Sequence, residues 1–242
     1  MSWAPAFLSN PERFMAFSRW AAPMFGLIAL ILAVVGLYLG FIAPPDYQQG
    51  QTVRIMFIHV PAAYMASFVY VCLAGASFLS LIFRHALADA AAQAAAPLGA
   101  GFTLLALVTG SLWGRPMWGT YWVWDARLTS VLVLFLLYVA YIALRASMDD
   151  EIKAARAGAI LALVGSINLP IVHYSVEWWN TLHQGASVFK KGGSSLAPVF
   201  LTPLLIMALA YTSAFGSLWL VRIRGELWRR RAEAAALRVA RG

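Results

Sequence analysis

Residues 23–43 read PMFGLIALILAVVGLYLGFIA, an apolar segment of 21 residues without a charged side chain. A helix needs about 20 mainly apolar residues to cross the hydrocarbon core of a bilayer. The segment therefore predicts a membrane-spanning helix. It is longer than the apolar part of a signal peptide, and no small-x-small cleavage pattern follows it, so we expect it to remain as an anchor.

The rest of the chain has the same character. Of the 242 residues, 62% are hydrophobic and 12% are charged, and the mean hydropathy is +0.73. Water-soluble domains contain about 45–50% apolar and about 25% charged residues, so that class is excluded. We expect an all-α integral membrane protein, a single polytopic domain over residues 1–242 with six transmembrane helices. These helices are expected at residues 23–43, 60–83, 94–112, 128–144, 157–176 and 198–221.

The basic residues indicate how these helices are oriented. Thirteen Lys and Arg belong to the N-terminal segment, the second and fourth connections and the C-terminal tail, against five in the other three connections. Cytoplasmic segments carry the excess of Lys and Arg. We therefore expect both termini in the cytoplasm of a bacterial inner membrane, with the first, third and fifth connections in the periplasm. The five outward residues are Arg54, Arg115, Arg127, Lys190 and Lys191.

The charge distribution and several missing motifs exclude broad classes of function. The net charge of +8 reflects topology and arginines near anionic lipid headgroups, so nucleic-acid binding has no support. No G-x-x-x-x-G-K-[ST] loop is present, which excludes ATP hydrolysis by a P-loop. No charged residue lies near the middle of a predicted span, where ion-coupled transporters need one. Hydrolase motifs are also missing, and the single cysteine, Cys72, excludes an internal disulfide and is expected to pack.

The third connection, residues 113–127, is richer in aromatic residues than a membrane-interface belt requires, since a belt supplies one or two rings at each span end. Trp118, Tyr121, Trp122 and Asp125 have i, i+3, i+4, i+7 spacing, so a helical turn would put them on one face. This predicts a flat aromatic shelf at the membrane surface. The four tryptophans are Trp113, Trp118, Trp122 and Trp124. The residues expected to interrupt the chain before that turn are Gly114, Pro116 and Gly119.

Such a shelf, flanked by Arg115 and Arg127, favours a large, flat and partly anionic ligand. A porphyrin ring stacks on indoles and its propionates pair with arginine, although a quinone or a lipid would also stack. Histidines distinguish these ligands, because haem iron takes axial imidazole ligands.

Two of the four histidines are placed to ligate haem iron. His59 precedes Pro61, and proline favours the first helical position, so His59 is expected at the outer N-terminus of the second span. There the helix dipole favours a neutral imidazole. His183 lies in the fifth connection, which adds Trp178 and Trp179 on the same side of the membrane. The pattern predicts haem binding by His59 and His183.

The remaining polar features have structural interpretations. His173 is expected to be buried and hydrogen-bonded within the fifth span, and His85 to be an ordinary interfacial residue. Residues 149–151 are expected to begin a helix, because acidic residues favour a helix N-terminus. Asn168 with Pro170 predicts a packed kink. The tail from residue 222 onward is expected to form a basic helix along the inner leaflet, with Trp228 as a possible anchor.

Residues 113–129, WGRPMWGTYWVWDARLT, resemble the WWD signature of tryptophan-rich haem-handling membrane proteins of cytochrome c biogenesis. Residues 53–63 and 174–184 resemble the other outward segments of the six-span cytochrome c maturation protein C (haem exporter protein C) family. The resemblance covers about residues 20–225. One departure is Tyr121, where the family often has tryptophan; tyrosine still stacks.

The resemblance implies that haem b is bound non-covalently and transiently on the outer face, with His59 and His183 as axial ligands. It implies presentation of the haem to a membrane-tethered periplasmic chaperone, whose own histidine bonds covalently to a haem vinyl group. It also implies an ABC-type complex of ATPase, permease and small single-span subunit. The chain is then a delivery protein and no enzyme. The residues expected at the haem are His59, His183, Trp113, Arg115, Trp118, Tyr121, Trp122, Trp124, Asp125, Arg127, Trp178 and Trp179.

Two alternatives stay open on sequence grounds. The chain could form a haem export channel or permease subunit, although its spans lack a polar or charged lining. It could also be a haem lyase, but the related lyases are much longer and carry further histidines and soluble domains.

Overall fold

The computed structural model describes residues 10–183, 185, 188 and 193–241; Lys190, Lys191 and Gln184 of the expectations above lie outside them. The described chain is helical and contains no strand. Its elements are α2 (Pro11–Ile42), η1 (Gln51–Ile55), α3 (Met56–Phe83), α4 (Ala86–Trp118), α5 (Ala126–Ala146), α6 (Glu151–Gly165), α7 (Asn168–Trp178) and α8 (Pro198–Arg241). Six segments are long and apolar enough to cross a membrane, with α6 and α7 together forming the fifth. The predicted all-α fold with six spans is confirmed.

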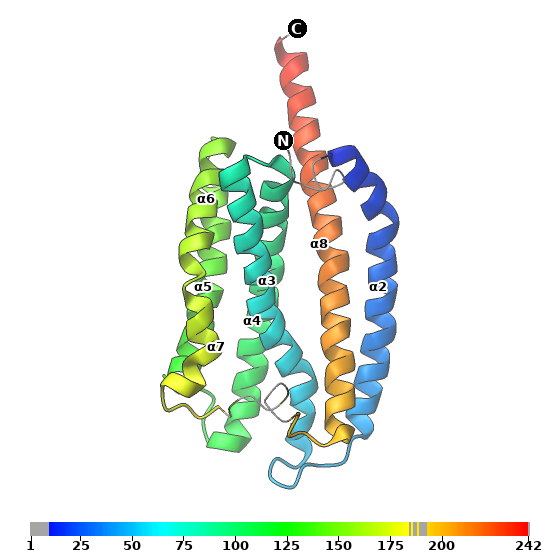
Figure 1. Cartoon of the computed structure of the whole chain (residues 1–242), viewed down its shortest axis with the longest axis vertical. Coiled ribbons are helices and arrows are strands. Elements are labelled where there is room, and N and C mark those ends of the chain that lie inside the picture. The colour runs from blue at the N-terminus through cyan, green and yellow to red at the C-terminus, as the bar shows by residue number, and fades with distance from the viewer. Residues whose placement is uncertain (1–9, 184, 186–187, 189–192, 242) are drawn as a thin grey trace.

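The helices form an upright bundle in which α3 and α4 pack closely on each other (Figure 1). On one side of this pair, α5 packs on α4 and α6 packs on α3, while α7 packs on α5. On the other side, α8 packs on both α3 and α4, and α2 packs on α8 at the edge of the bundle. The α3–α4 pair is therefore the central layer.

Alternation of the helix directions gives the bundle two distinct ends. We call one the site end, where α2, α4 and α7 finish and α3, α5 and α8 begin (Figure 1). We call the other the tail end, where α2 begins and α8 extends beyond the other helices. Three features lie at the site end: the first turn of α3 with His59, the tryptophan-rich connection, and the connection with His183.

Polar side chains fix where four of the helices begin. Side-chain atoms of Asn10, His85, Asp125 and Asp150 each accept a backbone N–H from the first turn of α2, α4, α5 and α6. Such N-caps satisfy donors that have no partner within the helix. The expected helix start at residues 149–151 is therefore confirmed, and His85 has a defined role as a cap.

Each span extends past at least one end of the apolar segment that predicted it, as α2 does at its start and α4 at both ends. The α4 helix begins at Ala86, because the alanine run before residue 94 favours helix as strongly as the apolar run does. It ends at Trp118, because the next residue, Gly119, has a left-handed φ of 77°. The α3 helix begins at Met56, so placing Pro61 at its first position was wrong: this proline lies inside the helix.

The fifth span is interrupted between α6 and α7, as the Asn168 and Pro170 pair predicted. The side chain of Asn168 is buried, and its Nδ2 donates to the backbone oxygen of Ser130 in α5 at 2.9 Å. A neighbouring helix thus supplies the partner that a buried amide requires. The kink is packed, and no polar lining of the span results from it.

Small residues let the central helices approach closely. A Cβ on Gly99 in α4 would overlap the ring of Tyr138 from α5, and one on Gly165 in α6 would overlap the hydroxyl of Tyr70 from α3. Tyr70 and Tyr138 meet edge to face at 5.0 Å between ring centroids. The Tyr138 hydroxyl donates to the backbone oxygen of Ala66 at 2.9 Å. Tyr138 and Tyr70 therefore occupy the spaces that Gly99 and Gly165 leave.

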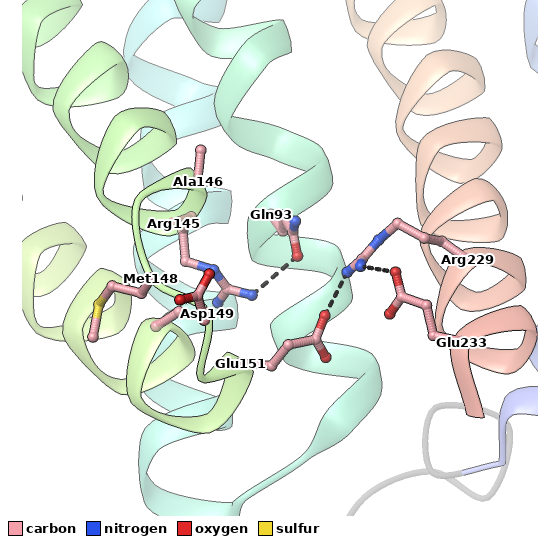
Figure 2. A pocket seen from close by; sticks show the side chains of 9 residues that line it. Gln93, Arg145, Ala146, Met148, Asp149, Glu151, Arg229 and Glu233 are labelled. Carbon is pink, nitrogen blue, oxygen red and sulfur yellow. Dashed lines mark hydrogen bonds and ion pairs between the residues drawn. The ribbon is translucent and has the colours of Figure 1, made fainter. Parts of the chain in front are cut away.

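Ion pairs join the helices at the tail end. Asp89 of α4 pairs with Arg145 of α5 and with Arg230 of α8, and the Arg145 side chain is only 6% exposed. Figure 2 shows the adjoining cavity of about 430 Å³, which Arg229 borders with its ion pairs to Glu151 and Glu233. Because α8 is held here to both α4 and α6, its charged residues stabilise the packing of the bundle.

The expectation of a separate tail helix along the inner leaflet was wrong, and these contacts explain why. The α8 helix runs without interruption to Arg241, and its last turns extend beyond the bundle (Figure 1). Arg224 donates to the backbone oxygen of Met15 at 2.9 Å, and Arg231 pairs with Glu12. Both contacts hold the helix alongside α2 where a bend was expected.

Replacing Gly99 by alanine should destabilise the bundle, because the added methyl group overlaps Tyr138. We expect a cost of about 1–3 kcal/mol, as for other overpacked cores. Gly101 is the matched control, since it lies in the same helix and a Cβ there meets nothing within 4 Å. The Gly101→Ala variant should unfold at the same temperature as the unmodified protein or slightly higher, because alanine favours helix by about 0.5–1 kcal/mol. Thermal unfolding in detergent measures both, and equal effects would contradict the packing assignment.

Candidate functional site

The site end of the bundle brings together residues that are far apart in the sequence. His59 lies in the first turn of α3, Trp113 and Trp118 lie in the last turns of α4, and Asp125 caps α5. His183 lies in the connection between α7 and α8. The two imidazoles are close enough for a charge on one to act on the other.

His59 is held by the neighbouring helix α4. Its Nδ1 lies 3.1 Å from the backbone oxygen of Ala106 and 3.1 Å from the hydroxyl oxygen of Thr109. The Trp113 ring meets the imidazole edge to face at 5.6 Å between centroids. These contacts all involve the Nδ1 side and the ring, so Nε2 remains to bind a ligand.

His183 is held less tightly than His59. Its ring meets Trp118 edge to face at 4.9 Å, and its Nδ1 lies 3.7 Å from Oδ2 of Asp125, beyond hydrogen-bond distance. This nitrogen is buried without a hydrogen-bond partner among the described residues. Burial lowers the pKa of His183 from its ordinary 6.5, with a further contribution from Arg127, against the opposing effect of Asp125. The side chain is therefore neutral near pH 7, which is the state that binds a metal.

Asp125 organises two chain segments around His183. Its Oδ1 accepts the backbone N–H of Leu128 at 2.7 Å, which starts α5. Its Oδ2 accepts the backbone N–H of Leu182 at 3.2 Å, which fixes the residue next to His183. One carboxylate thus joins the tryptophan-rich segment to the histidine of the following connection.

The predicted helical shelf was wrong in its conformation. Trp118 is the last residue of α4, whereas Tyr121, Trp122 and Asp125 belong to a non-helical connection. Neither Gly114 nor Pro116 interrupts the helix, since both lie within the last turns of α4. The missing side chain of Gly114 leaves space for the Trp118 ring. The aromatic residues still gather at one end of the bundle, but the helix end and the connection position them separately.

The connection after α4 contributes a second pair of rings. Trp122 and Trp124 meet edge to face at 5.4 Å between centroids. Trp124 is 75% exposed, whereas Nε1 of Trp122 is buried and has no hydrogen-bond partner among the described residues. A buried indole N–H normally finds an acceptor, so this donor is available to a bound anionic group.

The two arginines differ in their surroundings. Arg127 donates to the backbone oxygens of Val172 and His173, which joins the start of α5 to α7. Arg115 donates to the oxygen of Gly119 and lies over the Tyr121 ring at 5.5 Å. Arg127 therefore has a structural role already, whereas Arg115 is exposed at the rim of the site.

Further aromatic residues at the end of α7 form an exposed row. Tyr174 stacks on Trp178 at 5.3 Å, and Trp178 meets Trp179 edge to face at 5.7 Å. The expectation of a buried, hydrogen-bonded His173 was wrong: its side chain is exposed and packs edge to face on Tyr174. The α7 helix turns its buried face, with Val172 and Ser175, toward α5 and leaves His173 outside.

Several residues that shape the site carry no sequence signal of their own. Thr109 and Gly110 are ordinary members of an apolar helix, and their role depends on the packing of α3 against α4. Gln49 lies in the connection after α2 and accepts the N–H of Trp113 at 3.0 Å. The spacing of Thr109, Gly110 and Trp113 puts them on one helix face, but the residue that this face contacts could be known only from the packing of α3.

The arrangement suits a flat ring that carries a metal. Two imidazoles and several indoles lie at the site end, where Nδ1 of His183 and Nε1 of Trp122 have no hydrogen-bond partner in the described part of the chain. A bare metal ion fits poorly, because no cluster of three or more His, Cys, Asp or Glu occurs in the described parts of the chain. Haem needs only two axial ligands from the protein, and the residues present fit it.

Comparison with known proteins agrees with this geometry. The family model described as "Heme exporter protein C" matches residues 5–238. The chain is 58% identical to Heme exporter protein C of Bradyrhizobium diazoefficiens, over 93% of this chain and 85% of the relative. It is 47% identical to Heme exporter protein C of Escherichia coli K12, over 90% and 88%. It is 44% identical to the putative cytochrome c biosynthesis ccmC-like mitochondrial protein of Marchantia polymorpha, over 80% and 85%. The chain therefore belongs to the Heme exporter protein C family, multi-pass membrane proteins of cytochrome c biogenesis.

Proposed function

We propose that this protein binds haem b at the site end of the bundle, with His59 and His183 as the two axial ligands. The observation that carries the proposal is the convergence of these histidines, which are 124 positions apart in sequence, beside Trp113 and Trp118 at the ends of packed helices. When bound, haem supplies the iron that the imidazoles hold. The chain supplies position, aromatic contact and a partly buried setting.

The aromatic residues divide into three groups with different tasks in this proposal. Trp113 and Trp118 contact the two histidines and hold the imidazole rings in place. Trp122, whose N–H has no partner among the described residues, would donate to an anionic group such as a propionate, and exposed Arg115 offers a charge. The outer residues Tyr121, Trp124, Trp178 and Trp179 leave room at the rim for a partner protein.

We further propose that bound haem is presented to a periplasmic chaperone of cytochrome c maturation. Haem held at the bundle end would keep one ring edge accessible to a partner, as covalent attachment to another protein requires. The chain has no P-loop, so the energy for release of the loaded chaperone comes from an ABC-type ATPase with its permease and small single-span subunit. The contribution of this protein is then positioning, without bond-forming chemistry of its own.

A haem export channel is less well supported than presentation. The described core between α3, α4 and α5 is filled by Tyr70, Leu134 and Tyr138, which are essentially inaccessible. A route for haem along the bundle axis would have to displace these side chains. The site end needs no such movement.

The histidine assignment predicts the absorption spectrum of the purified protein. Protein isolated in mild detergent should carry a haem band, and His59→Ala and His183→Ala should each reduce it. The double variant should lose the band and fail to load the chaperone. His173→Ala is the matched control, because that histidine is exposed at the same end of the bundle and should leave the band unchanged. Normal chaperone loading by the double variant would overturn the assignment.

Asp125→Asn keeps the cap of α5 and removes the carboxylate oxygen that lies beside His183 and accepts the N–H of Leu182. Asparagine caps helices as well as aspartate does, so the unfolding temperature of the haem-free protein should change little. The loss of the charge and of the Leu182 bond should weaken haem binding roughly tenfold, as for other partners of metal-binding histidines. Asp150→Asn changes the equivalent cap of α6 at the tail end and should leave haem titrations unchanged. Equal haem affinities in the two variants would contradict this role.

The proposed orientation places the site end in the periplasm. In a Cys72→Ala background, Tyr47→Cys introduces a thiol at the site end at a position that is 89% exposed. Ile152→Cys does so at the tail end, where Ile152 is 83% exposed. A membrane-impermeant maleimide should label Tyr47→Cys in intact spheroplasts and Ile152→Cys only after permeabilisation. The reverse pattern would place the haem site in the cytoplasm.

A further inference from the structure

We propose that Thr109 and Gly110 of α4 are positioning residues that hold the His59 imidazole in one tautomer and one orientation, with Nε2 free to bind haem iron. This inference rests on the proposed function, because it concerns the same ligand. It adds that the ligand is prepared by the neighbouring helix before haem arrives.

One face of α4 contacts the His59 imidazole. Ala106, Thr109, Gly110 and Trp113 have i, i+3, i+4, i+7 spacing, so they lie along a single helix face. In order, they present to His59 a backbone oxygen, a hydroxyl oxygen, a position without a side chain and an indole ring. Four successive positions on this face thus contact one side chain of α3.

Two acceptors of α4, the Ala106 oxygen and the Thr109 hydroxyl, together fix the tautomer. The Thr109 hydroxyl has a single hydrogen and donates it to the backbone oxygen of Leu105 at 2.6 Å. Its lone pairs therefore face Nδ1 of His59, as do those of the Ala106 oxygen. A nitrogen next to two acceptors carries the proton, so Nδ1 donates and Nε2 keeps its lone pair. Metal-binding histidines are commonly fixed in this way by their second nitrogen.

Gly110 gives the ring its place. A Cβ at this position would lie 2.9 Å from Cε1 of His59 and 3.8 Å from Nε2. The imidazole would have to move away from α4, which would lengthen both bonds of Nδ1. Because Nε2 belongs to the same rigid ring, this movement would also change the direction of its lone pair.

His183 has no equivalent support. Its Nδ1 has no hydrogen-bond partner among the described residues, and the nearest carboxylate oxygen, Oδ2 of Asp125, is 3.7 Å away. We therefore infer that His59 is the fixed ligand and His183 the adjustable one. Changes at Thr109 should affect the iron through His59 alone.

The experiment compares Thr109→Val, Thr109→Ser and Thr103→Val in the full chain. Valine keeps the shape of threonine and removes the acceptor, whereas serine keeps the acceptor. Thr103 is the matched control, because its hydroxyl makes the same kind of intrahelical bond, to the Gly99 oxygen at 2.7 Å, and lies six positions before Thr109 in the same helix. Nitrogen-15 spectra of histidine-labelled, haem-free protein report the tautomer of His59. Haem titration and the reduction potential report its strength as a ligand.

Thr109→Val leaves the Ala106 oxygen as the remaining acceptor of the pair, so it should shift the Nδ1 signal of His59 in the haem-free protein, weaken haem binding about tenfold and raise the reduction potential. The potential rises because a lost acceptor on Nδ1 makes the imidazole a weaker electron donor. Thr109→Ser should restore all three values, and Thr103→Val should match the unmodified protein. An unchanged tautomer signal and potential in Thr109→Val, at unchanged haem affinity, would overturn the inference.

Gly110→Ala provides a second test should Thr109→Val fail to fold. It should weaken haem binding, whereas Gly101→Ala, where a Cβ meets nothing within 4 Å, should not. Equal haem affinities in these two variants would also overturn the positioning role. The proposed function fails separately, through haem binding that survives loss of both His59 and His183.

Discussion

The packing of α3 against α4 is the contact on which the rest of the structure depends. It builds the core around Tyr70 and Met65, and the other spans are arranged on its two sides. The same contact continues to the site end, where α4 stops contributing apolar side chains and contributes acceptors to His59. Helix pairing in lipid depends on close packing more than on the hydrophobic effect, so small residues are needed along the contact.

The bilayer explains why chemistry is confined to the two ends. Unpaired polar groups are costly within the hydrocarbon region, so the middle of the bundle holds mainly tyrosines and aliphatic residues, and the side chains of Tyr138 and Asn168 find partners in neighbouring helices. Charged residues pair at the tail end, where Asp89 pairs with two arginines. The tryptophan-rich connection, His59 and His183 lie at the site end. One bundle therefore separates a structural end from the end proposed to bind haem.

The six spans could be predicted from the sequence, because apolar segments of membrane-spanning length have few alternative structures. The sequence also singled out His59 and His183 as haem ligands, and that assignment stays a prediction. The ends of α3 and α4 could not be predicted, because helices continue past the apolar segment where alanine or a capping residue permits. The predicted conformation of the aromatic shelf was wrong, because the left-handed φ of Gly119 ends α4 at Trp118. The contact of Thr109 with His59 could not be predicted, since it depends on where α3 packs on α4.

The two histidines differ in how they are held, and the difference bears on the proposed delivery of haem. A resident cofactor is best held by two equally fixed ligands, whereas cargo must be released to a partner. Here His59 is hydrogen-bonded to one helix face, whereas the contacts of His183 among the described residues are those with Asp125 and Trp118. If the two histidines hold haem as proposed, a site with one preorganised and one adjustable ligand loses less on opening, because only the adjustable side has to move. The asymmetry in hydrogen bonding would then suit a delivery protein.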